Sequence, residues 1–260
     1  MEVIDLNGRK GLVIGTANEH SLAWWAAKHL ANAGAELAIT YLNEKAKPFV
    51  APLGESIGAP ILEPCNVSVS GQLEAVFDTI RARWERLDFA FHSIAWARKE
   101  DLHGRLTDCS ADGFTEAMQI SCYSFIKMAR LAEPLMTEGG SLTTLSFYGA
   151  EKVVDHYNVM GPVKAALEAS VRYLAHELGT LRIRVNALSA GAVETRAASG
   201  IEHFDELLNE TARKAPLRRR VEACEVGRVA VMLASDYASA ITGEIVHVDA
   251  GFHVAGMIFH

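Results

Sequence analysis

The sequence lacks the patterns that mark disulfide-stabilised, metal-binding and membrane-spanning proteins. It has four cysteines and no Cys-x2-Cys pair, which indicates reduced thiols rather than a disulfide framework or a zinc site. Its ten histidines include no His-Glu-x2-His motif and no other ligand spacing, so we expect no metal. Long apolar runs are missing too, and the N-terminus MEVIDLNGRK does not resemble a signal peptide. These absences predict a cytoplasmic protein without membrane contact.

A strong charge of either sign is also missing. The chain has 25 Lys and Arg residues against 32 Asp and Glu residues, a net charge of -7, which argues against nucleic acid as a partner. Internal repeats and low-complexity segments are absent. With 260 residues, half of them hydrophobic, the chain is long enough for one sizeable core. We therefore expect a single domain over residues 1–260.

The first forty residues predict a β-α-β unit, which implies a parallel sheet in an α/β protein. Residues 11–15 (GLVIG) form a short apolar run that ends in glycine. Residues 21–34 have helical spacing with Ser21 as the expected N-cap, and 35–41 form a second apolar run. The turn before the helix lacks the Gly-x-Gly-x2-Gly motif, yet its N–H groups and the helix N-terminus can bind a pyrophosphate.

The same alternation of strands and helices continues to the end of the chain. Further strands are expected at 59–67, 88–95, 141–146, in the first part of 183–200, and at 243–251. Helical segments at 111–136 and 157–179 are apolar on more than one face, which favours burial. Either these helices are buried within one subunit, or they form a helix-pair interface between subunits.

The most informative stretch, residues 141–170, contains Tyr157 and Lys164. On a helix, seven residues make about two turns and about 10 Å of rise, so both side chains are expected on one face. The ammonium would favour the phenolate and lower the tyrosine pKa from its reference of ~10. Taken alone, such a pair is more often two surface residues of an amphipathic helix. In the right context, it suits proton donation.

That context resembles the short-chain dehydrogenase/reductase superfamily, and within it the NADH-dependent enoyl-acyl carrier protein reductases. Besides the Tyr-x6-Lys segment, four runs resemble theirs in the same order: HSIAWA (92–97), ISCYSF (120–125), RVNALSAGAVETRAASGI (184–201) and GEIVHVDAGF (243–252). Most of the superfamily has Tyr-x3-Lys, but Met160 occupies that tyrosine position here. The x3 pair Tyr148 and Lys152 follows a strand too directly to lie on the same helix. In enoyl reduction the oxygen lies two carbons from the hydride acceptor, a chemical reason for the longer spacing.

The resemblance implies a doubly wound, seven-stranded parallel sheet (Rossmann-like), NAD as cofactor, a role in fatty acid biosynthesis and a homotetramer. It implies that Tyr157 and Lys164 are catalytic and that a substrate lid covers about 193–222. The implied substrate-binding residues are Trp96, Phe147 and Tyr157. The implied cofactor-binding residues are Gly15, Ser21, Leu22, Leu42, Asn66, Val67, Ser93, Ile94, Ala95, Lys164, Val193 and Thr195.

The end of the second strand bears on the choice between NADH and NADPH. Neither an acidic residue for a free ribose nor an arginine for a 2′-phosphate stands at Tyr41-Leu42-Asn43. Glu44 would repel a phosphate, whereas Lys45 and Lys47 would attract one. We expect NADH to be preferred over NADPH.

Several positions depart from the family pattern. Asn66, Ala95, Phe147, Ala192 and Ala250 stand where relatives usually have Asp, Gly, Tyr, Pro and Gly. These departures leave two alternatives open. One is a short-chain dehydrogenase that acts on another enoyl or a carbonyl substrate, and the other is a non-catalytic nucleotide-binding paralogue. Met160 disfavours a ketone reductase, and the intact pair of Tyr157 and Lys164 argues against a non-catalytic protein.

The expected lid carries an unusual charge pattern. Where relatives often have basic residues, this chain has Glu202, Asp205, Glu206 and Glu210, and the three glutamates share one helix face at i, i+4 and i+8. An acidic face opposes the approach of an acidic acyl carrier protein. The substrate is expected to be an acyl thioester, but docking of the carrier protein is doubtful unless the basic residues at 213–220 provide it.

Overall fold

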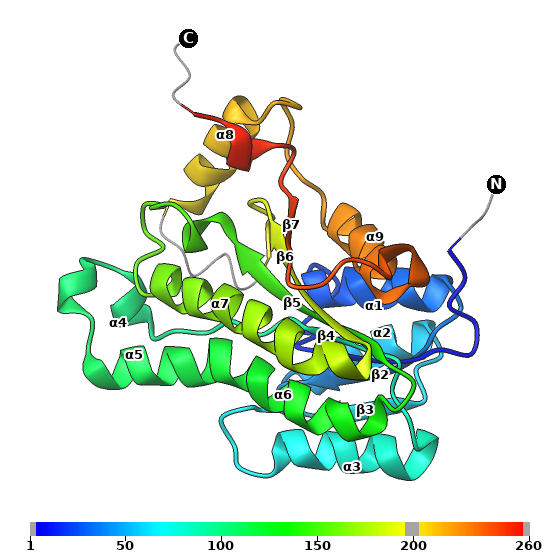
Figure 1. Cartoon of the computed structure of the whole chain (residues 1–260). Coiled ribbons are helices and arrows are strands. Elements are labelled where there is room, and N and C mark those ends of the chain that lie inside the picture. Colours follow the sequence, from blue (N-terminus) through cyan, green and yellow to red (C-terminus); the bar gives the residue numbers. More distant parts are fainter. Residues whose placement is uncertain (1–3, 196–202, 257–260) are drawn as a thin grey trace.

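The computed structural model describes residues 4–195 and 203–256. Seven parallel strands form one sheet in the order β3-β2-β1-β4-β5-β6-β7, with helices on both faces (Figure 1). The strands are β1 (Lys10–Ile14), β2 (Glu36–Tyr41), β3 (Ile61–Pro64), β4 (Phe89–His92), β5 (Gly140–Phe147), β6 (Ile183–Ala190) and β7 (Ile245–Val248). The predicted doubly wound α/β fold is confirmed. Strand order reverses between β1 and β4, and ligands of such sheets bind beyond the carboxyl ends at this point.

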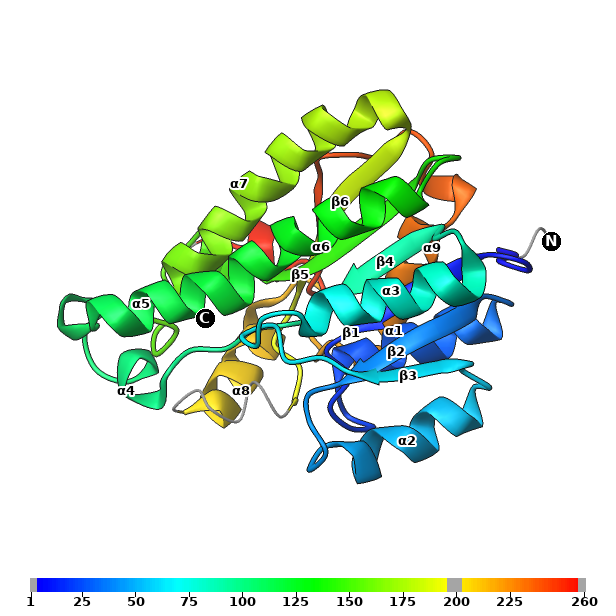
Figure 2. The ribbon, with the colours of Figure 1, turned by 90° about the horizontal axis from the view of Figure 1, so that it is seen from below.

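Two helical layers cover the sheet. Helices α3 (Gln72–Trp84), α5 (Ala111–Met118), α6 (Ser124–Ala132) and α7 (Met160–Leu178) pack on one face (Figure 2). Helices α1 (Leu22–Asn32), α2 (Lys47–Ser56) and α9 (Ala223–Ala234) pack on the other. Two further helices, α4 (Lys99–Leu102) and α8 (Phe204–Lys214), lie at the carboxyl end of the sheet. No helix in the described ranges is long and apolar enough to cross a bilayer.

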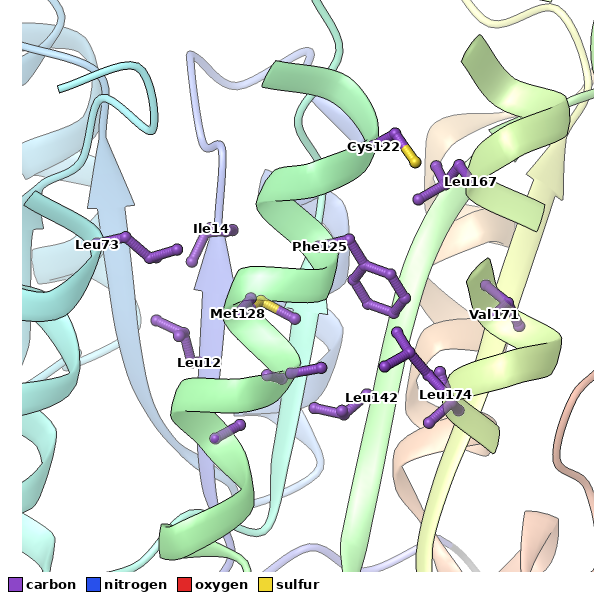
Figure 3. Close-up of a cluster of buried hydrophobic side chains, with 14 of the residues drawn as sticks. Leu12, Ile14, Leu73, Cys122, Phe125, Met128, Leu142, Leu167, Val171 and Leu174 are labelled. Carbon is purple, nitrogen blue, oxygen red and sulfur yellow. The ribbon is translucent and has the colours of Figure 1, made fainter. Parts of the chain in front are cut away.

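The core between α6, α7 and the sheet fixes the helix that follows Tyr157. Figure 3 shows Phe125 and Met128 of α6 beside Leu142 of β5 and Leu167 of α7, and all four are fully buried. Burying each such side chain contributes about 1.5–3 kcal/mol. The packing of these side chains fixes the position of the N-terminal end of α7 relative to the carboxyl end of β5.

The helical segment expected at 111–136 is confirmed, but it is not α-helical throughout. A π-helical turn, Gln119–Tyr123, separates α5 from α6. In this turn the Ser121 hydroxyl accepts from Trp96 N (2.8 Å) and donates to Trp96 O (2.9 Å). Such insertions often occur at functional sites because the extra residue redirects a side chain. Here the turn fixes the backbone of a predicted substrate-binding residue.

Three predicted strands end earlier than expected. β3, β4 and β7 end at Pro64, His92 and Val248. The residues beyond the first two of these strand ends, including 65–67 and 93–95, line a cavity instead of extending the sheet. Apolar character alone does not separate the last strand residues from a loop that covers a ligand site.

Candidate active site

Two adjoining cavities open at the carboxyl end of the sheet. The switch-point cavity, of about 730 Å³, lies beside the ends of β1 to β4. The lid cavity, of about 470 Å³, lies between the segment around α4, the ends of β5 and β6, and Phe204 of α8. The two share part of their walls: Leu22, Ala95, Trp96, Ser146 and Thr195. Molecules bound in the two cavities would therefore touch.

The residues predicted from the sequence gather around these cavities. The predicted substrate-binding residues Trp96, Phe147 and Tyr157 line the lid cavity, and so does Val193. Residues 196–202 of the predicted lid lie outside the described ranges, whereas α8 forms its later part. The other predicted cofactor-binding residues line the switch-point cavity: Gly15, Ser21, Leu22, Leu42, Asn66, Val67, Ser93, Ile94, Ala95, Lys164 and Thr195.

The turn after β1 leaves room for a phosphate at the start of α1. Gly15 has φ +96°, and a Cβ there would lie 2.1 Å from Ser93 O, so no other residue fits without a shift of the backbone. Ser21 caps α1, and its hydroxyl accepts from Trp24 N at 3.3 Å. The buried Thr16 hydroxyl beside this turn has no hydrogen-bond partner among the described residues. An open helix N-terminus and an unsatisfied hydroxyl fit a pyrophosphate.

The end of β2 offers no cation to the same cavity. The Tyr41 hydroxyl bonds Glu44 (3.0 Å), and Lys47 lies 3.6 Å from the Glu44 carboxylate. Tyr41, Glu44 and Lys47 do not line the switch-point cavity, whereas Leu42 does. The charged residues of its lining are Glu116 and Lys164. The described lining therefore provides no positive clamp for a ribose 2′-phosphate.

Tyr157 does not lie on the helix that carries Lys164. Helix α7 begins at Met160, so the expected arrangement on one helix face is wrong. The reason is local: His156 and Asn158 have φ values of 62° and 37°, which no helix accommodates. The Asn158 amide holds this turn by donating to the carbonyls of Leu102 (2.5 Å) and Gly104 (2.8 Å). Through Asn158, the catalytic tyrosine predicted from the sequence is thus tied to the α4 segment as well as to the start of α7.

The ring of Tyr157 is enclosed on two sides. Phe147 packs against it with a centroid distance of 4.9 Å and an interplanar angle of 60°. On the other side, a Cβ at Gly149 would come within 2.4 Å of the ring, so glycine is required for this close approach. Only 8% of Tyr157 is exposed. The phenol is held in one place at the wall of the lid cavity.

The ionisation of Tyr157 differs from the sequence-based expectation. Burial raises its pKa, and the nearby Glu168 carboxylate raises it further, so the phenol stays protonated near neutral pH. Burial also lowers the pKa of Lys164 to about 8. The Lys164 ammonium donates to Leu145 O at 2.7 Å. The predicted lowering of the tyrosine pKa is wrong because desolvation and the Glu168 carboxylate both raise it.

Sequence reasoning missed a buried polar chain beneath the cavities. His92, at the end of β4, lies 2.9 Å from the Thr144 hydroxyl and 2.8 Å from the Ser124 hydroxyl. Ser124 donates to Ile120 O (2.6 Å), so it accepts from His92, and Thr144 then donates to the other ring nitrogen. Burial lowers the pKa of His92 to about 3, so the ring is neutral. The only sign of this polar chain in the sequence was the presence of polar residues inside otherwise apolar segments.

The family departures have different local consequences. Ala95 lines both cavities, and Ala192 is buried in the wall of the lid cavity. Ala250 has φ +56°, the left-handed region where relatives have glycine. Asn66 keeps a structural role, because its side-chain oxygen accepts from Ser68 N at 3.0 Å.

Comparisons with known proteins agree with this geometry. The chain is 49% identical over 252 residues to enoyl-acyl-carrier-protein reductase (NADH) 1 of Rhizobium meliloti (strain 1021), covering 97% of this chain and 93% of that protein. A crystal structure of the Anaplasma phagocytophilum reductase in complex with NAD superposes with a TM-score of 0.94 at 51% identity, over 99% of this chain and 98% of that one. The Bacillus cereus reductase, crystallised with NADP+ and indole naphthyridinone, has a TM-score of 0.95 at 44% identity, over 97% and 99%.

The sequence model of one protein family matches almost the whole chain. It is described as enoyl-(acyl carrier protein) reductase and covers residues 15–253, from the turn after β1 to the segment after β7. Both cavities and the segment from Tyr157 to Lys164 lie within this match. Similar length and fold accompany the match, and the chain belongs to the enoyl-(acyl carrier protein) reductase family.

Proposed function

We propose that this protein reduces the 2,3 double bond of a trans-2-enoyl thioester with NADH, as a step of fatty acid biosynthesis. One observation carries the proposal: two cavities share a wall, with Tyr157 in one and Lys164 in the other. The switch-point cavity suits a dinucleotide, and the lid cavity is lined mainly by apolar side chains that suit an acyl chain. The names of the relatives, which are NADH-dependent enoyl reductases, support the same activity.

The residues present fit NAD. The open N-terminus of α1, the turn at Gly15 and the unsatisfied Thr16 hydroxyl would hold the pyrophosphate. Lys164 would bond the nicotinamide ribose from the inner end of the same cavity. NADH supplies a hydride when it is bound there. Preference for NADH over NADPH is supported by the missing cation near Leu42.

The protein's own contribution is to stabilise charge on the substrate. Addition of hydride at the β-carbon moves negative charge to the thioester oxygen. Tyr157, protonated because burial raises its pKa, would donate a hydrogen bond to that oxygen. Phe147 cannot donate, so Tyr157 acts without a second phenol at this wall, and Lys164 supplies a positive charge from the lining of the adjoining cavity. The apolar lining of the lid cavity excludes water and strengthens both interactions.

The lid supports docking of an acyl carrier protein better than its sequence suggested. Glu202 lies outside the described residues. Glu210 is paired with Arg213 (2.8 Å) and Lys214 (3.4 Å), and Glu206 lies 3.1 Å from His203. The acidic stripe is therefore partly neutralised within α8. We propose that an acyl carrier protein thioester is a substrate and that the remaining charge of Glu206 weakens its docking.

Assembly and location form part of the same proposal. We propose a cytoplasmic homotetramer in which α5, the π-turn and α7 contact other subunits. Exposed aromatic side chains on these segments, Phe114, Tyr123 and Tyr173, support an interface there. Native mass spectrometry would measure the subunit number, and a monomer at micromolar concentration would contradict the proposed assembly.

A single assay tests the activity against its alternatives. Loss of NADH absorbance is followed with a short enoyl-CoA and, separately, with a panel of ketones. Turnover of the enoyl thioester alone is expected. Turnover of ketones alone would indicate a carbonyl reductase, and NADH binding without any turnover would indicate a non-catalytic nucleotide-binding protein.

A further inference from the structure

Two residues of α7, one helical turn apart, hold the carboxyl end of β5. The Lys164 ammonium donates to Leu145 O at 2.7 Å, and the Ser146 hydroxyl donates to a Glu168 carboxylate oxygen at 2.5 Å. At positions i and i+4 the two charged side chains project from one helix face. Only 4% of Lys164 and 6% of Glu168 are exposed. Ser146 lines both cavities, so this contact lies at their junction.

Three of the described groups face Lys164: Glu168, Cys122 of the π-turn and His92 of β4. Glu168 is the one anion among them. Burial raises the thiol pKa of Cys122 and lowers the pKa of His92 to about 3, so both are neutral near pH 7. The Tyr157 phenol is neutral as well. Burial disfavours the Lys164 charge, whereas Cys122, Glu168 and the hydrogen bond to Leu145 O favour it. Of these groups only Glu168 carries a negative charge near pH 7.

The surroundings of Glu168 divide between groups that favour and disfavour its charge. Burial and the Glu151 carboxylate raise its pKa, whereas the Ser146 hydrogen bond, His247 and Arg172 lower it. His247 of β7 also lies 3.1 Å from Glu151 and so partly offsets that carboxylate. The hydrogen bond from Ser146 is made to the ionised form, which is the form that stabilises Lys164.

We propose that Glu168 is a positioning residue of the reductase: its carboxylate keeps Lys164 protonated and fixes Ser146 at the junction of the two cavities. The inference rests on the proposed function, because the lysine charge matters only if a nicotinamide ribose and a developing oxyanion lie beside it. Glu168 itself lines neither cavity, so it acts through Lys164 and Ser146.

The pH profile of kcat/KM tests this role. Glu168→Gln keeps the shape of the side chain and removes its charge. Glu168→Asp keeps the charge but withdraws the carboxylate from Ser146. Glu177→Gln is the matched control, because it removes a charge from the exposed face of α7. NADH oxidation with a short enoyl-CoA is measured from pH 6 to pH 10. The wild type should lose activity around the Lys164 pKa of about 8. In Glu168→Gln the midpoint should fall by about one pH unit, which lowers kcat/KM about fivefold at pH 8 and little at pH 6.

The control variants make the result decisive. Glu177→Gln should follow the wild-type profile, and Glu168→Asp should keep the wild-type midpoint even where its kcat is lower. A Glu168→Gln midpoint equal to that of the wild type would overturn the proposal, and so would an equal shift in Glu168→Asp. If the glutamine variant does not fold, the aspartate variant still tests the proposal, because a lowered midpoint there contradicts the role of charge.

A failure of the proposed function would look different. In that case the wild type itself would not oxidise NADH with an enoyl thioester at any pH. The pH dependence of NADH affinity, followed by nucleotide fluorescence, would then replace the rate as the readout. As the pH rises, the NADH affinity of Glu168→Gln should still weaken at a pH about one unit lower than that of the wild type. Coincident curves of affinity against pH would overturn the role of Glu168.

Discussion

Replacing Tyr157 by phenylalanine isolates the phenolic hydroxyl. The ring is 8% exposed and packs on Phe147 and against Gly149, and phenylalanine keeps these contacts. Phe147, which packs on the ring, has no donor, and the Ser146 hydroxyl is already bonded to Glu168. Loss of one oxyanion donor typically lowers kcat about 10²–10³-fold, which corresponds to about 2.7–4 kcal/mol. We expect a loss of that size in Tyr157→Phe.

Steady-state NADH oxidation with a saturating enoyl-CoA measures kcat, and the KM for NADH is determined in the same assay. The KM should change little, because Tyr157 lines the lid cavity and not the switch-point cavity. Tyr148→Phe is the matched control, since it removes a phenol from a residue that lines neither cavity. A kcat within threefold of the wild type would refute the role of Tyr157, and an equal loss in Tyr148→Phe would refute its specificity.

Three further outcomes follow from the same structure. The kcat/KM should be higher with NADH than with NADPH, and a clear preference for NADPH would identify Lys45 or Lys47 as a phosphate ligand. Ala250→Gly should stabilise the protein by roughly 0.5–1 kcal/mol in urea unfolding, since it relieves a left-handed alanine that costs about 1–2 kcal/mol at the expense of some chain entropy. Glu206→Lys should raise kcat/KM for an acyl carrier protein substrate at low salt without affecting an uncharged thioester analogue, and equal effects on both substrates would exclude docking as the cause. Glu210→Lys should gain less because it breaks pairs with two basic residues.

The sheet was predictable because strands and helices alternate with clear periodicity. A buried parallel strand reads as a short apolar run, and β1, β2 and β5 were placed to within one residue at each end. For β6 the sequence predicted the start at Ile183 but not the end. The ends of β3 and β4 were not, because their following loops are equally apolar where they line a cavity. Spacing also could not reveal that α7 starts after Tyr157, since that depends on the left-handed residues on either side of the tyrosine.

The sequence was enough to predict which residues line the candidate site, but not their pKa values. Residue types along the chain located Tyr157, Lys164 and the turn at Gly15. Their pKa values depend on burial and on partners distant in sequence, such as Glu168 beside Ser146. A glutamate four residues after a lysine looks like a surface pair in sequence, and only the packing of α7 on β5 shows that both are buried.

The side chain of Asn158 couples the width of the acyl site to its chemistry. Its amide donates to two carbonyls of the α4 segment, while its backbone directly follows Tyr157, the donor that we propose for the substrate oxygen. An acyl chain that pushes α4 outward would also pull on the donor. Chain length would therefore alter turnover as well as affinity, and variants selected to accept longer acyl groups would need a second change near Asn158 to recover their rate.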